Sequence, residues 1–382
     1  MNKKQRVKAA LSREALDKVP FGEFAVDFDT VEKLLGHETY LRAKAKSQIA
    51  FWEGRRDEVV QSWKEDTVEL FKKLDCFDLI NLSAAASGVC PPKNYAPKDP
   101  PVKIGENTWK DKAGRVYQYS PVTADITVVD DPTVWDAEYT VDDFVIEQVA
   151  KPDDSVFEVV DYVTERLGDE YFIIGSSGGE SGFTLLGSFE RGLMEFLTAP
   201  EVVAAATAKE TAQANQADHF YIQPRVDAVM WGVDFAYNAG PFIDPALFRQ
   251  TCLPNIQSRV KNVKEHFSKY VFKHACGNNW KLMDMFIEAG YDCYQSLQGS
   301  ASMDLKELKR LYGSRICLWG GLPVEHLVSG TREEIKADVA YIARYGFENG
   351  GYIFGSSHSI AVGTKYDNFM SMIDEFEKVR AL

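Results

Sequence analysis

Paired cysteines, positive charge and long apolar runs are all scarce in this 382-residue sequence. Its six cysteines are scattered, which predicts a reduced, cytoplasmic protein without a disulfide framework. Lysine and arginine together number 43 against 57 acidic residues, for a net charge of -14. Such a charge disfavours nucleic acid and anionic membrane surfaces as partners. The basic residues near the N-terminus precede no apolar run long enough for a signal peptide or a membrane span.

Several motifs of common enzymes are also missing. The run from Gly175 to Gly179 resembles a phosphate cradle, but no Gly-Lys-Ser/Thr follows, so it is not a P-loop. No Gly-x-Ser-x-Gly elbow accompanies Ser356 and Ser357, which argues against a serine hydrolase. The sequence therefore has to be interpreted from its periodicity and its strand ends.

Short apolar runs alternate with helical stretches along the whole chain. The predicted strands are 19–26, 77–83, 171–176, 225–233, 269–275, 291–297, 315–319 and 350–356. The predicted helices are 155–167, 184–222, 245–267, 279–289, 303–312, 331–346 and 365–379. This α/β alternation predicts a single (β/α)8 TIM barrel that forms one domain over residues 1–382. The alternative, a doubly wound open sheet, would carry a Gly-rich fingerprint after its first strand, and residues 19–36 have none.

Two stretches exceed a minimal barrel. Residues 28–75 predict two or three N-terminal helices, and the Pro-rich insertion 84–140 predicts a β-hairpin over 103–120 around Gly114. Both follow predicted strands, so both belong to the C-terminal face, where barrel enzymes hold their sites. We expect the insertion to be a lid or a docking element.

The triplet His274-Ala275-Cys276 ends the fifth predicted strand. A His and a Cys two residues apart at a strand end point to the same side. Imidazole nitrogen and thiolate sulfur are preferred zinc ligands. His358 follows the eighth predicted strand, so the sequence predicts a shared metal site of His274, Cys276 and His358. The alternative is a buried structural cysteine beside a hydrogen-bonded histidine.

Other polar and aromatic residues follow further predicted strands and converge if the barrel is correct, because a barrel mouth is one concave pocket. The further candidates for catalysis or substrate binding are Phe24, Asp27, Glu180, Asp234, Tyr237, Asn238, Gln298 and Trp319.

These motifs resemble the uroporphyrinogen decarboxylase superfamily. The matching segments are Asp227 to Asp234, Gly240-Pro241, Asp244-Pro245, His274 to Asn278, Gly320-Gly321, and Gly350-Gly351 leading to Asn368. The resemblance covers nearly the whole chain, is densest after residue 225, and implies a (β/α)8 barrel. True decarboxylases have arginines after the first strand and an aspartate after the second. Residues 22–27 here contain no arginine, and residues 81–86 contain no aspartate.

The resemblance instead favours the corrinoid-dependent methyltransferase branch. Its thiol-methylating members bind zinc through His-x-Cys and a later Cys, and this chain has His358 where that Cys is expected. The implied activity is demethylation of a small methylated or methoxylated substrate, as in an aromatic ether O-demethylase, with transfer to cobalamin on a partner corrinoid protein. Zinc would be held by His274, Cys276 and His358. Asp234, Glu180 and His274 are the catalytic candidates, and Phe24, Asp27, Tyr237, Asn238, Gln298 and Trp319 the substrate-binding ones. A decarboxylase and a non-catalytic binding scaffold remain the alternatives, and the sequence leaves open whether the chain forms a homodimer.

Overall fold

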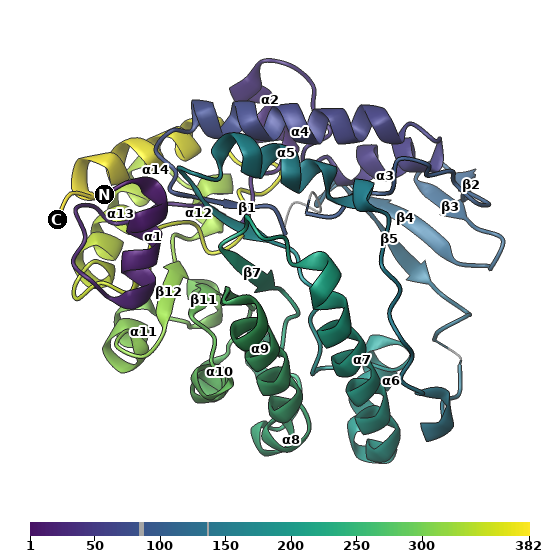
Figure 1. Ribbon diagram of the computed structural model, residues 1–382. Coiled ribbons are helices and arrows are strands. Elements are labelled where there is room, and N and C mark those ends of the chain that lie inside the picture. Colours follow the sequence, from purple (N-terminus) through teal and green to yellow (C-terminus); the bar gives the residue numbers. More distant parts are fainter. Residues whose placement is uncertain (84–87, 136) are drawn as a thin grey trace.

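A curled parallel sheet forms the centre of the molecule (Figure 1). The computed structural model describes residues 1–83, 88–135 and 137–382. The strand order is β1-β6-β7-β10-β11-β12-β13. The strands are β1 (Leu79–Asn81), β6 (Phe172–Gly175), β7 (Ala228–Trp231), β10 (Tyr270–His274), β11 (Cys293–Ser296), β12 (Cys317–Gly320) and β13 (Tyr352–Ile353). Nearly all of their residues are buried, as expected for parallel strands covered on both faces.

Residues 20–22 close this sheet into the predicted (β/α)8 barrel. Their backbone exchanges two hydrogen bonds with Phe354, beyond β13 (3.1 and 2.8 Å), and accepts a third from Asp78, before β1 (2.7 Å). The strand predicted over 19–26 is wrong in extent, because only isolated bridges form there. The physical reason is Pro20, which has no backbone N–H to give to a ladder.

Helices connect the strands and surround the barrel. They are α5 (Glu158–Leu167), α6 (Phe189–Thr198), α7 (Pro200–Tyr221), α8 (Pro245–Thr251), α9 (Leu253–Phe267), α10 (Met283–Ala289), α11 (Leu305–Tyr312), α12 (Val324–Ser329), α13 (Arg332–Gly346) and α14 (Tyr366–Val379). The predicted helices 184–222 and 245–267 are each divided in two, at Ala199 and Cys252, with Pro200 and Pro254 beginning the next turn. Within the described residues, no helix is both long and apolar enough to cross a bilayer.

Helix α1 (Lys3–Ser12) covers the N-terminal end of the barrel. Val7 and Ala10 pack in one buried cluster with Phe172 and Trp319 from the barrel interior. The carboxylate of Asp78 accepts hydrogen bonds from the guanidinium groups of Arg6 and Arg380 and from the Phe21 N–H. We call these three charged residues, Asp78, Arg6 and Arg380, the closed-end cluster. It connects the first and last helices to residues 20–22, which we call the closing segment.

The C-terminal face carries the extra segments. Helices α2 (Phe28–Leu35), α3 (Lys44–Trp52) and α4 (Arg56–Lys73) precede β1. The insertion 84–140, of which residues 84–87 and 136 lie outside the described part, forms a four-stranded antiparallel sheet in the order β2-β3-β4-β5. Its strands are β2 (Val102–Gly105), β3 (Thr108–Lys110), β4 (Val116–Ser120) and β5 (Asp125–Asp130).

The region predicted as a hairpin, 103–120, contains most of β2 and all of β3 and β4 of this larger sheet. Its turn joins β3 to β4. The sheet packs on α3, where the Trp52 ring lies 5.9 Å from Trp109 and 5.5 Å from Tyr117. The insertion thus packs on one of the extra helices that precede β1.

Candidate metal centre and cavity

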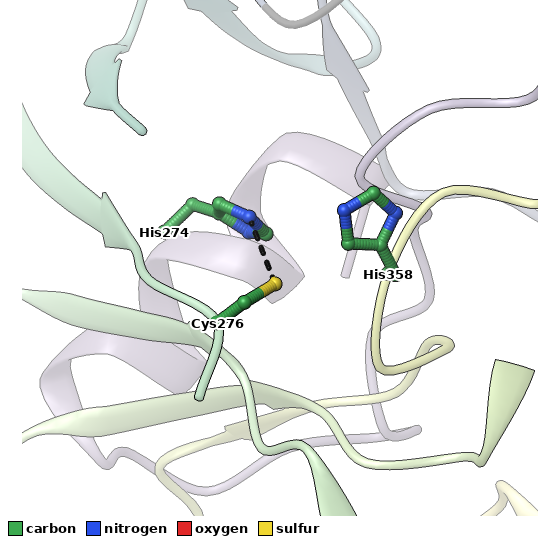
Figure 2. Close-up of side chains that lie close together, drawn as sticks. All are labelled: His274, Cys276 and His358. Carbon is green, nitrogen blue, oxygen red and sulfur yellow. Dashed lines mark hydrogen bonds between the residues drawn. The ribbon is translucent and has the colours of Figure 1, made fainter. Parts of the chain in front are cut away.

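His274 and Cys276 lie at the mouth because β10 ends at His274. His274 is in register with Gln295 on β11, and its Nδ1 hydrogen-bonds to Gln295 Oε1. The Gln295 amide nitrogen donates to the Ser356 carbonyl (3.4 Å), which fixes the orientation of the amide. Nδ1 is therefore the protonated nitrogen, and the lone pair on Nε2 faces Cys276 Sγ at 3.4 Å (Figure 2).

His358 completes the cluster from the loop that follows β13. One ligand atom from each of His274, Cys276 and His358 can be chosen so that all three lie within 4.8 Å of one another. Figure 2 shows the His358 ring facing the other two side chains. Phe24 stacks on His274 with ring centroids 4.1 Å apart, and its centroid lies 5.8 Å from that of His358. The three predicted ligands therefore share one place, with an aromatic ring beside them.

The backbone around the cluster adopts positive φ angles, which are rare for residues other than glycine. Gly277 has φ +81°, and a Cβ there would lie 2.4 Å from the Ala236 carbonyl oxygen, so the turn after Cys276 requires glycine. Ser296 and Leu297, which follow in β11 and its loop, also have positive φ (120° and 52°). The surrounding fold imposes these strained backbone conformations, and such conformations are common at functional sites. Ser296 Oγ lies 3.6 Å from Cys276 Sγ.

Burial sets the protonation states of the cluster. It lowers the pKa of His274 to about 3, so the ring is neutral at physiological pH. Burial, aided by the Asp234 carboxylate, raises the pKa of the Cys276 thiol to about 12. The pKa of His358 is also lowered, because protein atoms displace water from part of its ring. Two neutral imidazoles and a thiol that a cation can deprotonate make a donor set suited to zinc.

The His274–Cys276 spacing and the second hydrogen bond of His274 agree with that donor set. Zinc bonds of about 2.0–2.3 Å place tetrahedral ligand atoms roughly 3.3–3.8 Å apart, and the His274–Cys276 distance of 3.4 Å lies in this range. A zinc-bound histidine normally donates its other N–H to an oxygen, as His274 does to Gln295. The residues present therefore fit a zinc ion held by His274, Cys276 and His358.

A cavity of about 520 Å³ opens beside this cluster. Its lining combines two ligands of the cluster with three of the predicted substrate-binding residues and with neighbours that the sequence did not indicate. The lining residues are Ala236, Tyr237, Asn238, Cys276, Gly277, Gln298, Val324, Glu325, Ser357 and His358. The predicted contributions of Tyr237, Asn238 and Gln298 thus meet at one place.

Asp27, Trp319 and Glu180 lie outside this lining. Asp27 is buried in an ion pair with Arg42 (2.7 Å). Trp319 is fully buried in the barrel interior, where its indole N–H donates to the Gly22 carbonyl (2.8 Å). It points inward because successive strand residues alternate sides, and the sequence placed the end of β12 too early. The structure therefore gives Trp319 a structural position.

Glu180 and Asp234 bind backbone groups next to the metal-ligand cluster. Glu180 is buried against the ammonium of Lys273, and its Oε2 accepts the Val233 N–H (2.7 Å), while Lys273 donates to the Val233 carbonyl (2.6 Å). This pair fixes the backbone before Asp234, whose Oδ1 accepts the Cys276 N–H (2.7 Å). Both acids thus hold the backbone that presents Cys276.

Sequence reasoning did not include Gln295 or Glu325 among the site residues. Gln295 has a sequence signal, as a polar residue near the end of the predicted strand 291–297, but only the strand register reveals that it lies opposite His274. Glu325 lies in α12, a short helix that was not predicted, and its sequence context carries no comparable signal.

The fold and the cluster define a class: a (β/α)8 barrel protein with a candidate zinc centre and an open cavity at its C-terminal face. The family model of uroporphyrinogen decarboxylase (URO-D) matches residues 123–379. The match covers more than half of the chain, which therefore belongs to this family.

A solved structure supports the fold. A methyltransferase from Methanosarcina mazei is 15% identical, with 99% of each chain covered and a TM-score of 0.64. A presumed vitamin-B12-independent methionine synthase from Listeria monocytogenes is 11% identical over 95% of this chain and 96% of that one. Its TM-score of 0.45 is too low to bear on fold or function. No curated protein matches the chain in sequence.

Proposed function

We propose that this protein is a cytoplasmic methyltransferase that takes a methyl group from a small methylated or methoxylated donor, such as an aromatic ether, and passes it to the corrinoid of a partner protein. The observation behind this proposal is the His274/Cys276/His358 cluster, which opens directly on the 520 Å³ cavity. The barrel likeness to a Methanosarcina mazei methyltransferase supports the fold on which the proposal rests.

The corrinoid and zinc would contribute one part of the chemistry, and the residues of this chain would contribute another. When bound, the corrinoid supplies a strong cobalt nucleophile and zinc supplies a Lewis acid. The chain holds the donor in the cavity and keeps its methyl group turned toward the open side, where a partner can reach it. We assign His274 to the metal rather than to proton transfer, because Gln295 occupies its Nδ1 and its Nε2 faces Cys276 Sγ.

The site argues against the two alternatives. A uroporphyrinogen decarboxylase must bind a polycarboxylate, yet none of the cavity-lining residues in the described chain is lysine or arginine. A non-catalytic scaffold would have no need for three metal-ligating side chains with a supporting glutamine beside an open cavity.

Methyl transfer to free reduced cobalamin tests the proposal. Metal-loaded protein is mixed with cob(I)alamin and a panel of methoxylated and methylated donors, and the loss of the Co(I) absorbance is followed. Demethylation of at least one donor is the expected result. If no donor of any class methylates cobalamin, the methyltransferase proposal fails and the scaffold alternative takes its place.

We further propose that the β2–β5 sheet forms part of the docking surface for the corrinoid protein. It follows β1, packs on α3 and lies at the C-terminal side of the barrel (Figure 1). Replacing residues 102–130 by a short Gly/Ser linker should slow transfer to the partner protein while transfer to free cobalamin continues. Equal losses with both acceptors would contradict a docking role.

A further inference from the structure

A second cavity, of about 450 Å³, lies at the N-terminal end of the barrel, where α1, α11 and α13 meet (Figure 1). We call it the basic pocket, because its lining combines four cationic side chains with one carboxylate, that of Glu348. The cations are Arg13, Lys306, Lys309 and Arg310. The whole protein has a net charge of -14, so the pocket concentrates positive charge in an otherwise acidic molecule.

Three of these four cations have no acidic partner. Arg310 pairs with Glu307 on the same helix (2.8 Å). Arg13, Lys306 and Lys309 form no ion pair with any carboxylate in the described part of the chain. The pocket therefore holds positive charge that the protein itself does not neutralise.

Backbone carbonyls fix the positions of two of these cations. Lys309 Nζ donates to the Gly350 carbonyl (2.5 Å). Arg13 donates through Nε to the Gly313 carbonyl (3.3 Å) and through Nη1 to the Leu11 carbonyl (3.2 Å). A carbonyl oxygen orients a cation but carries only a partial negative charge, so it does not neutralise that cation. Both groups also keep further N–H donors for another partner.

Glycine allows the backbone to pack closely against Arg13. Arg13 ends α1 in the left-handed region, with φ 59°. Gly351 has φ +65°, and a Cβ there would lie 2.9 Å from the Gly313 carbonyl oxygen and 3.3 Å from Arg13 Cγ. The loop before β13 can approach the arginine this closely because it has no side chain at this position. The stem of Arg13 is thus packed in place rather than free in solvent.

The arrangement of Arg13 and Lys309 is unfavourable without an anion. Burial lowers the pKa of Lys309, and the positive charge of Arg13 lowers it further. Two like charges that are held close together and partly removed from water destabilise the fold. An anion between them would remove that repulsion.

We propose that the basic pocket binds the phosphate group of a small phosphorylated ligand, at a site separate from the mouth and independent of the proposed methyl transfer. A phosphate monoester carries nearly two negative charges and three acceptor oxygens, which match an arginine fork and lysine ammonium groups. The Ser314 hydroxyl and the Tyr345 ring complete the lining, and the ring centroid lies 5.3 Å from Lys306 Nζ. The ring and the remaining volume can receive an organic part of the ligand.

Three anions test the proposal on the full-length, metal-loaded protein. They are inorganic phosphate, phenyl phosphate and benzoate, and the last two share a ring but differ in charge. Binding is measured by isothermal titration calorimetry at low ionic strength. Phenyl phosphate should bind at least about tenfold tighter than benzoate and at least as tightly as phosphate. Its binding should weaken as sodium chloride is added, because salt screens partly exposed charges.

Lys309→Met is the decisive variant, and Lys269→Met is its matched control. Lys269 is also half-buried, with a pKa lowered by burial and with bonds to the Pro224 and Val226 carbonyls (2.8 and 2.7 Å), but it lies outside the basic pocket. Lys309→Met should weaken binding of phenyl phosphate about tenfold, while Lys269→Met should not change it. Lys306→Gln, at an exposed position, should weaken binding about threefold and replaces Lys309→Met if that variant does not fold.

A zinc ion at the mouth would also attract anions, so His274→Ala serves to separate the two sites. This variant lacks a metal ligand and should bind phenyl phosphate as the wild type does. Binding that is lost in His274→Ala but kept in Lys309→Met would place the anion at the mouth and overturn the proposal. Tighter binding of benzoate, exclusion of phenyl phosphate, equal losses in the Lys309 and Lys269 variants, or no saturable binding of either phosphate would also overturn it.

Discussion

The two ends of the barrel treat buried polar groups in opposite ways. At the N-terminal end, the closed-end cluster places one carboxylate between two guanidinium groups, so each charge has its partner. At the mouth, the His274 lone pair, the Cys276 sulfur and the His358 ring face one another. Three donors of electron pairs cannot satisfy each other without a proton or a cation between them.

This difference indicates that the polar groups at the closed end stabilise the fold and that those at the mouth serve function. Polar groups that satisfy each other inside a protein hold elements together, as Asp78 holds α1, α14 and the closing segment. Polar groups that all offer electron pairs destabilise the fold when they are held close together, and such an arrangement is typical of a site that binds a ligand. The comparison predicts that damage at the closed end appears as unfolding, and damage at the mouth as lost metal and activity.

The largest effect is expected from Asp78→Ala. It removes the acceptor shared by Arg6 and Arg380 and leaves buried positive charge poorly compensated. We expect a loss of about 3–5 kcal/mol in the free energy of unfolding, measured by chemical denaturation. Asp284→Ala, which breaks an exposed pair with Arg315, is the control and should cost less than about 1 kcal/mol. Similar losses in both variants would show that the closed-end cluster stabilises the fold no more than an exposed ion pair does.

His274→Ala is the counterpart at the mouth. It should reduce methyl transfer at least ~100-fold and remove most of the bound zinc, because a metal ligand is lost. His326→Ala, which replaces a histidine on α12 outside the cavity lining, is the control and should retain both. Unchanged turnover in the His274 variant, with a responsive donor in hand, would exclude His274 from the mechanism.

A smaller effect is expected from Gln295→Met, which keeps the side-chain volume and removes the acceptor for His274 Nδ1. The zinc dissociation constant, measured by competition with a chelator, should rise about 10–100-fold. Gln295→Glu retains an acceptor and should bind zinc more tightly than the Met variant. If the two variants bind zinc equally, the hydrogen bond to His274 does not tune the site.

The smallest effect is a pH dependence at the closed end. Hydrogen bonding to Arg6 holds the pKa of Asp17 below its ordinary value of 3.8. A lowered folded-state pKa means that the stabilisation is complete above 3.8 and is lost as the pH falls through the folded pKa. Because Asp17 is partly exposed, roughly 0.5–1 kcal/mol is expected. The difference in unfolding free energy between wild type and Asp17→Asn should therefore shrink between pH 6 and pH 3. A constant difference would show that the pair contributes nothing.

The barrel and the mouth cluster could be predicted from sequence, because strand periodicity and strand-end polarity are local signals. His274 and Cys276 were placed correctly at the end of β10 for that reason. Trp319 was misplaced because β12 continues to Gly320, one residue beyond the predicted end, so Trp319 lies within the strand and packs in the barrel interior. Glu180 was predicted to be catalytic because nothing near it in sequence reveals Lys273, its buried partner.

The closing segment has a consequence for how the protein is made. Residues 20–22 pair with Phe354, and Phe24 packs beside His358, although most of the chain separates them. During synthesis, the ribosome makes residues 20–24 long before Phe354 and His358, so this segment can bond Asp78 early but lacks its partner across the closure until residue 354 has been made. A nascent chain halted before residue 354 would have both His274 and Cys276 yet no third ligand and no closed barrel. The proposed zinc site can therefore form only after the ribosome has passed residue 358.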